Sequence, residues 1–206
     1  KQLYISEPNE KIVMGSKYPT FSFRLSKAFQ LDNNLKKAFT NIEFNVEQYF
    51  NVGILGTSEY RIGIGRFLDT TKVAPMDYQY QRGGDPIWFS PSMYTYQYIP
   101  ETFSTFNWFF ESHYEHQFNG FLTSKIPLLN KTGLKTVAGA GLLYVPDKNY
   151  QYSELYAGIN RIFKLGKTRF RIGAYYVAAQ SNKFGLKSGF KFSFEPYNRN
   201  KNTWSF

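Results

Sequence analysis

A long alternation of apolar and polar residues between Asn41 and Ile54 most constrains how this chain folds. The even positions from Ile42 to Ile54 are apolar except for Gln48, and most of the odd positions between them are polar. A period of two over this length predicts one β-strand with an apolar face and a polar face. Strands of globular proteins usually have about 5 to 6 residues, whereas a tilted strand that crosses a bilayer needs about 9 to 11. The predicted strand is long enough to cross a membrane.

The same alternation recurs along most of the chain. It is clear in Phe21–Leu25, Phe170–Tyr176 and Phe190–Phe194, whereas Leu134–Val145 is apolar on both faces. No helix of consequence is evident. The pattern predicts about eight antiparallel strands, near residues 18–26, 40–55, 58–67, 102–118, 134–146, 152–163, 168–180 and 186–195.

The two faces of these strands differ in a way that favours a membrane. The apolar positions are rich in Phe, Tyr and Trp and carry no charge, whereas the opposite positions carry Arg, Glu, Asn, Gly and Ser. A charge that faces lipid near the bilayer midplane costs about 2–4 kcal/mol. A soluble β-sandwich is the competing interpretation, but its strands are short and its outward faces carry charges freely. We therefore predict an all-β fold, an antiparallel transmembrane β-barrel in the outer membrane of a Gram-negative cell.

Composition agrees with this interpretation. Aromatic residues make up 20% of the 206 residues while the mean hydropathy is only −0.44, as expected when each strand has one apolar face. A helical membrane bundle is excluded because no stretch approaches the roughly 18 consecutive apolar residues that a spanning helix needs. The absence of Cys excludes thiolate metal sites and a Cys nucleophile.

The formal net charge of +10 points to acidic partners. We expect these to be membrane lipid and lipopolysaccharide, with other outer-membrane or periplasmic proteins as further candidates. Nucleic acid is not expected, because stacking grooves place aromatic and basic residues on one face whereas here many lie on opposite faces.

The predicted strands divide the chain into three parts: an N-terminal segment or fragment edge at 1–17, strands over 18–195 with a long loop at 68–101, and a tail at 196–206. Because the sequence starts at Lys1 without a leader, we expect a processed product or an internal fragment. The last residues, Trp204–Phe206, look like a terminal insertion signal of outer-membrane barrels. The competing assignment ends the closing strand at Phe194.

Four stretches carry a resemblance to a known family. They are Tyr60–Gly65, Phe103–Glu115, His116–Phe121 and Lys125–Leu129. In this order they resemble the C-terminal part of a Bacteroidetes-type family of outer-membrane barrels of unknown function. In that family the barrel commonly follows a carboxypeptidase-regulatory-like domain, and it is similar to BamA-like assembly and secretion barrels. The resemblance implies that the eight strands are the C-terminal half of a barrel of about sixteen.

The resemblance also implies a role for the long loop 68–101. In BamA-like proteins the corresponding loop folds back into the lumen and carries an Arg-Gly tip, which here falls on Arg82, Gly83 and Gly84. In the family the loop arginine pairs with an acidic residue of the barrel wall, an ion pair that we call the lock. The acidic position falls on Gly139 here, so the resemblance implies a lock without its acid. The competing interpretation is an exposed Gly-Gly turn, which the following Asp-Pro dipeptide favours.

A polar cluster is predicted on one face of the strand near 102–118. Glu111, His113 and Glu115 follow one another at a spacing of two, about 7 Å apart along the strand. They could hold a divalent metal, move protons or receive the loop arginine. The interpretation favoured over these is a polar lumen wall with ion pairs, to which Arg169 and Arg171 contribute. We predict no metal, no cofactor and no catalytic residue.

A hydrolytic pair is the remaining chemical hypothesis. Ser112 and His116 share one parity, but that parity is assigned to lipid, and no Gly-x-Ser-x-Gly elbow is present. The function implied by the resemblance is a part in the assembly, translocation or surface display of envelope proteins. The alternatives are a complete eight-stranded barrel that acts as an anchor or adhesin, and an outer-membrane hydrolase.

Overall fold

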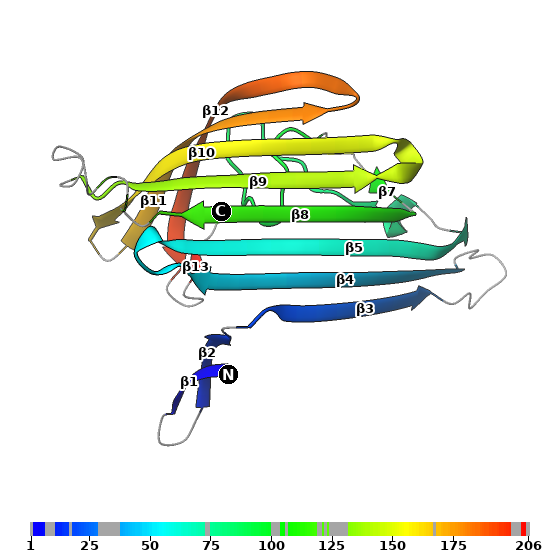
Figure 1. Cartoon of the computed structure of the whole chain (residues 1–206), viewed down its shortest axis with the longest axis horizontal. Coiled ribbons are helices and arrows are strands. Elements are labelled where there is room, and N and C mark those ends of the chain that lie inside the picture. The colour runs from blue at the N-terminus through cyan, green and yellow to red at the C-terminus, as the bar shows by residue number, and fades with distance from the viewer. Residues whose placement is uncertain are drawn as a thin grey trace.

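The computed structural model contains one long, curved antiparallel sheet (Figure 1). It describes residues 2–6, 11–16, 18–28, 38–72, 75–99, 104–105, 107–118, 121, 123, 132–166, 168–198 and 203–204. The long strands are β3 (Thr20–Ala28), β4 (Ala38–Asn51), β5 (Thr57–Lys72), β8 (Trp108–Gln117), β9 (Lys135–Val145), β10 (Tyr150–Leu165), β11 (Thr168–Ser181) and β12 (Phe184–Asn198).

Short elements complete the described part of the chain. A separate hairpin, β1 (Gln2–Ser6) and β2 (Lys11–Ser16), precedes the sheet, and the two-residue strand β13 (Thr203–Trp204) pairs with the end of β12. Strands β6 (Gln79–Tyr80) and β7 (Ser104–Thr105) pair with each other. The helical turns are 3-10 segments: η1 (Gly53–Leu55), η2 (Pro75–Asp77) and η3 (Pro146–Lys148). None of the helices in the described residues is long and apolar enough to cross a membrane.

The sheet confirms the predicted fold class and the eight long strands. Its strands are ordered β13-β12-β11-β10-β9-β8-β5-β4-β3, and neighbours among the long strands run antiparallel. Strand β5 extends to Lys72, beyond the predicted start of the long loop at residue 68. Strand β12 continues through Pro196 to Asn198, where a tail was predicted. The hairpin over residues 2–16 was not predicted.

The predicted alternation of faces is also confirmed. One face of the sheet, which we call the inner face, carries Glu43, Glu111, Glu154 and Lys191, all at most 8% exposed. The opposite, outer face carries the apolar parity, and its large side chains lie open: Phe23 and Leu155, for example, are each 66% exposed. The inner face thus buries charged groups together with aromatic and aliphatic side chains, whereas the outer face leaves large apolar side chains exposed.

Cross-strand pairing joins the exposed apolar side chains into a continuous belt. The register places Phe23 opposite Phe44, Phe44 opposite Ile64, Ile64 opposite Phe110 and Phe110 opposite Tyr144. Directly paired residues lie close enough for their side chains to touch. The belt therefore crosses five neighbouring strands without interruption.

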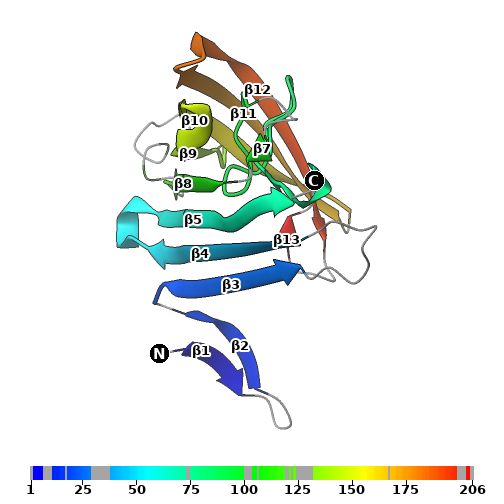
Figure 2. The same ribbon diagram turned by 90° about the vertical axis from the view of Figure 1, so that its right-hand side faces the viewer.

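The inner face is covered by part of the connection between β5 and β8. We call residues 81–99 of this connection the strap. The views in Figures 1 and 2 show the sheet curling around it. Strap aromatics pack with inward side chains of the sheet in two clusters, one containing Tyr96, Phe109 and Tyr152 and the other containing Phe89 and Tyr175. The sheet's buried interior is therefore a layer of aromatic and polar side chains between strands and strap.

The sheet does not close on itself within the described residues. Strand β3 pairs only with β4, and β12 pairs with β11 and with the two residues of β13. The free edge of β12 is partly occupied by the strap, because Phe89 N donates to Phe192 O at 2.7 Å and Phe192 N donates to Ile87 O at 3.0 Å. Unpaired edges of this length readily take up further strands.

The tight turn between β10 and β11 gives a first prediction. Gly166 has a φ of +57°, which an L side chain adopts only with strain, whereas Gly185 has an ordinary φ, and both face open space. Gly166→Ala is expected to lower the free energy of unfolding by about 1 kcal/mol in urea titrations of the folded chain. Gly185→Ala is the matched control. Equal effects of the two substitutions would contradict this account of the turn.

Candidate functional site

Several hydrogen bonds join the strap to the inner face of the sheet. A segment without regular strand pairing leaves many backbone groups to be satisfied, and buried ones must find partners. Here the partners are side chains of the wall, supplied by β8, β10 and β12. Strap residues Gln81, Ser92, Thr95, Tyr96 and Gln97 are all buried as a result.

Lys191 holds the strap from β12. Its ammonium Nζ donates to the backbone oxygens of Asp85 at 2.5 Å and of Gln97 at 2.6 Å, and its side chain is completely buried. The Tyr98 ring lies 4.6 Å from Nζ, a distance at which the cation is attracted to the ring. A buried ammonium is tolerated only when it is paired in this way. Lys191 therefore ties two points of the strap to one point of the wall.

Glu154 and Tyr152 hold the strap from β10. The Gln97 backbone N–H donates to Glu154 Oε2 at 2.8 Å, and the Tyr152 hydroxyl donates to the same oxygen at 2.6 Å. The Tyr152 oxygen in turn accepts the backbone N–H of Tyr98 at 3.1 Å. Two consecutive strap amides thus end on wall side chains.

Glu115 holds the strap from β8. Its Oε2 accepts the Ser92 hydroxyl at 2.5 Å and the Tyr156 hydroxyl at 3.0 Å, while Oε1 accepts Gln117 Nε2 at 2.9 Å. A carboxylate that accepts three hydrogen bonds on the inner face is well satisfied without a metal or a cation. Its role in the structure is to receive Ser92 of the strap.

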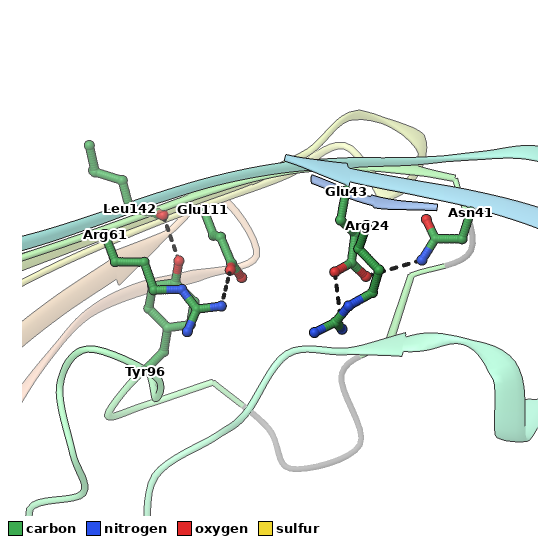
Figure 3. A network of polar contacts seen from close by, with 7 residues as sticks. All are labelled: Arg24, Asn41, Glu43, Arg61, Tyr96, Glu111 and Leu142. Carbon is green, nitrogen blue, oxygen red and sulfur yellow. Dashed lines mark hydrogen bonds and ion pairs between the residues drawn. The ribbon is translucent and has the colours of Figure 1, made fainter. Parts of the chain in front are cut away.

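Tyr96 lies at the centre of the contact. Its hydroxyl donates to the Leu142 backbone oxygen at 2.6 Å, as drawn in Figure 3, and its ring packs 4.4 Å from the ring of His113. Burial raises the pKa of Tyr96 well above its ordinary value, with the nearby Glu111 and Glu154 adding to the effect. The hydroxyl therefore stays protonated and remains a donor.

The Arg82-Gly83-Gly84 segment lies at the start of the strap, and the arginine side chain does not form the expected ion pair with the wall. Arg82 is exposed, and its guanidinium forms no ion pair with the carboxylates of the described residues. Its backbone oxygen accepts Tyr96 N at 2.9 Å, and Gly83 forms a bridge with Tyr96. The contact at this place is between two parts of the strap.

The position of the expected acid, Gly139, is closed to any side chain. A Cβ built there would lie 2.2 Å from the Tyr156 hydroxyl oxygen and 2.5 Å from the Tyr114 backbone oxygen. Tyr156 fills this space and donates to Glu115 instead. The strap is held instead by Glu115, Glu154 and Lys191.

The five residues of the predicted polar cluster are distributed over separate contacts. Glu111 pairs with Arg61 at 3.6 Å, and Arg171 pairs with Glu195 through its terminal guanidinium nitrogen. His113 packs on Tyr96 and Glu115 receives Ser92, whereas Arg169 is exposed near the start of β11. Within the described residues, no group of three His, Cys, Asp or Glu side chains is arranged to hold a metal ion.

The predicted Ser112 and His116 pair does not form a hydrogen-bonded unit. His116 Nδ1 lies 2.7 Å from Ser58 Oγ, and His116 Nε2 lies 3.1 Å from the Leu55 backbone oxygen. Because a carbonyl only accepts, Nε2 carries the proton and Nδ1 accepts from Ser58. Ser58 is 2% exposed, so this contact fastens the turn between β4 and β5 to β8.

Sequence reasoning did not single out the residues that hold the strap most directly, Lys191, Glu154, Tyr152 and Tyr156. All four lie on the polar or mixed face of predicted strands. The available signal in the sequence was Lys191, a lysine among the small and aromatic residues of the inward face. Asp85 was read as part of a turn, and the structure agrees. Its carboxylate accepts the backbone N–H groups of Trp88 and Ile87 at 2.8 and 2.7 Å, which lowers the pKa of Asp85 below its ordinary value.

Comparison with known proteins places the chain in a family. Residues 1–159 match the C-terminal domain of a family of unknown function (DUF5686), which covers more than half of the chain. The chain belongs to this family. No curated protein and no solved structure matches it. The sheet from β3 to β9 and the strap thus lie inside the matched region, whereas β11 and β12 follow it.

The role of Lys191 as an anchor can be tested directly. Lys191→Met leaves the Asp85 and Gln97 oxygens without their charged donor, a loss of about 1–3 kcal/mol for buried groups. We expect hydrogen exchange of strap amides to speed up markedly in mass-spectrometric measurements. The matched control is Lys187→Met, which removes an exposed ammonium from the same strand and parity. Unchanged exchange in Lys191→Met would refute the anchoring role.

Proposed function

We propose that this protein is an outer-membrane β-barrel protein. One observation carries the proposal: exposed apolar side chains form a continuous row across the outer face from β3 to β9, whereas Glu43, Glu111, Glu154 and Lys191 lie buried on the inner face. Burying apolar area is favourable by about 25 cal/mol per Å², so a belt left in water would be strongly unfavourable. A lipid bilayer around the sheet would bury the apolar outer face and leave the charged inner face away from lipid.

The placement of outer-face charges supports lipid contact. Arg66 and Arg161 belong to the outer parity of β5 and β10. Arg66 lies opposite Trp108, the first residue of β8, and the Arg161 guanidinium lies 4.9 Å from the centre of the Phe163 ring. Aromatic and basic residues at the ends of an apolar belt are typical of membrane–water interfaces. The strand lengths also meet the requirement for crossing, since β4, β5, β10, β11 and β12 each have 14 to 16 residues.

The open edges of the sheet support the interpretation that eight strands are part of a larger barrel. Transmembrane barrels need every backbone group paired, which requires closure. Strands β3 and β12 would each pair with further strands, and a barrel of about sixteen would place these eight in its C-terminal half. The alternative is a complete small barrel, in which β3 and β12 pair with each other.

For the role of such a barrel, we propose a part in the assembly, translocation or surface display of envelope proteins. The support is the resemblance of four stretches of the sequence to such barrels, together with a long connection that folds against the inner face. Because Gly139 carries no acid, any such role works with other loop contacts than an arginine-to-acid lock. The strap's occupation of the inner face is equally suited to a plugged anchor or adhesin, which is the second candidate.

Membrane contact of the belt can be tested by comparing two substitutions. Ile62 lies midway along β5 on the outer face, and Gln151 lies on the same face at the start of β10. Ile62→Arg is expected to reduce folding stability in phospholipid vesicles by about 2–4 kcal/mol, and Gln151→Arg by about 0–1 kcal/mol. On a water-exposed surface both changes would stay within about 0.5 kcal/mol, and that result would contradict the proposal.

The cellular role can be tested by depletion of the protein in its native cell, followed by quantitative proteomics of the outer membrane. Selective loss of surface proteins is the result expected for assembly or display. An unchanged surface proteome with weakened attachment of cells to surfaces would instead favour the anchor. Complementation with Ser112→Ala serves as the control for the hydrolase hypothesis, and full rescue would count against it.

A further inference from the structure

A polar pocket lies between the inner face and the start of the strap. Its volume is about 240 Å³, and its lining includes Arg24 from β3, Arg61 from β5, His113 from β8, and Gln81 and Arg82 from the strap. Figure 3 shows the side chains of Arg24 and Arg61 projecting from the sheet toward the side on which the strap runs. A cavity of this size can hold a small polyatomic ion with some water, since a water takes about 30 Å³.

Three arginines and two glutamates line the pocket within the described residues, so the lining has one unpaired positive charge. Arg24 pairs with Glu43 at 3.5 Å, and Arg61 pairs with Glu111 at 3.6 Å. The third arginine of the lining, Arg82, has no carboxylate partner among the described residues. Arginine presents several N–H donors in a planar fork that matches the oxygens of phosphate and carboxylate groups.

Buried donors point to the same place. Gln81 is 2% exposed and its amide Nε2 has no hydrogen-bond partner among the described residues, and neither does Arg61 Nε. Native proteins rarely leave buried donors unpaired, so each such group calls for a water, a ligand or an ion. Both groups donate and both residues line the pocket, so a ligand that binds both is an oxygen-rich acceptor.

His113 adds one acceptor to this set of donors. It is 3% exposed, and its Nδ1 has no partner among the described residues. With the ring proton on Nε2, Nδ1 is a hydrogen-bond acceptor. A ligand that completes the pocket must accept from Gln81 and the arginines and donate to His113.

We propose that this pocket binds inorganic phosphate. A phosphate that keeps one P–O–H group accepts from Arg61, Gln81 and Arg82 with its other oxygens and donates to His113 Nδ1. Sulfate has the same shape but no O–H group at neutral pH, so it lacks the last hydrogen bond. The pocket lies on the inner face under the strap, away from the outer belt, and so its ligand is a soluble anion. The proposal depends on the fold alone and not on the proposed cellular role.

Bound phosphate joins the strap to the wall, because Gln81 and Arg82 belong to the strap whereas Arg61 and His113 belong to β5 and β8. Binding therefore adds an attachment at Gln81 and Arg82, ahead of the point at which Lys191 binds the Asp85 oxygen. The strap's amides near residue 82 are expected to exchange more slowly when phosphate is present.

The test uses the purified full chain folded in detergent. Sodium phosphate is titrated at constant ionic strength maintained with sodium chloride, and binding is followed by calorimetry and by thermal unfolding. We expect saturable binding of phosphate, tighter than that of sulfate, with a rise in melting temperature and slower exchange of the strap near residue 82. No saturable binding, or phosphate and sulfate binding equally, would overturn the assignment.

Arg82→Ala provides the decisive variant, since the exposed Arg82 side chain pairs with no carboxylate of the described residues and its loss leaves the wall intact. Phosphate affinity is expected to fall about tenfold or more, as for loss of a charged hydrogen bond. Arg169→Ala is the matched control, because it removes an exposed arginine outside the pocket lining. An equal loss of affinity in both variants would show that net charge alone attracts the anion and would overturn the site.

Discussion

The whole architecture depends on giving hydrogen-bond partners to a polar inner face that is shielded from water. Every second residue of the long strands turns inward, and many of these residues are charged or hydroxyl-bearing. Some of them pair with one another across strands, as Arg171 does with Glu195, and the strap satisfies others through its backbone amides and carbonyls as well as its side chains. Glu154 binding the Gln97 amide and Lys191 binding two strap carbonyls show how a wall of ionisable groups and an irregular segment stabilise each other.

This arrangement also explains why the outer face is simple and the inner face is not. The outer face needs only a band of apolar side chains of sufficient width along the strands. Alternating Phe, Ile, Leu and Tyr residues provide this band without specific side-chain contacts. The inner face must match particular donors to particular acceptors. Small residues make room for this: Gly139 accommodates Tyr156, and Gly158 lies against the ring of Tyr175.

Much of the sheet could be predicted because its strands are long and their period of two is strict. The direction of each face followed from the same alternation, since a slip of one residue would place Glu43 or Glu154 in the apolar belt. Strand β9 resisted this reasoning because its inward side chains, such as Leu143 and Val145, pack on strap aromatics and are apolar too. Its parity depends on a segment distant in sequence, which no local pattern reveals.

The candidate site was harder to predict for a related reason. Strand parity identifies which side chains face inward but not which of them meet the strap: Arg169 and Arg171 share a parity, yet only Arg171 pairs with a carboxylate of β12. The strap's own contribution is largely backbone, and backbone groups leave no mark in the sequence. The acidic partner expected at Gly139 could not form there, because Tyr156 fills the space beside this glycine.

The two hydrogen bonds between Phe192 and residues Ile87 and Phe89 make the strap and the last long strand mutually dependent. Any strand that pairs along the full length of β12 must bond to the N–H and C=O of Phe192. It can do so only after the two hydrogen bonds between Phe192 and the strap have broken. A strand added at this edge and residues 87–89 of the strap therefore compete for the same backbone groups of β12. The hydrogen bonds of Lys191 and Glu154 to the strap stabilise the state in which the strap occupies this edge.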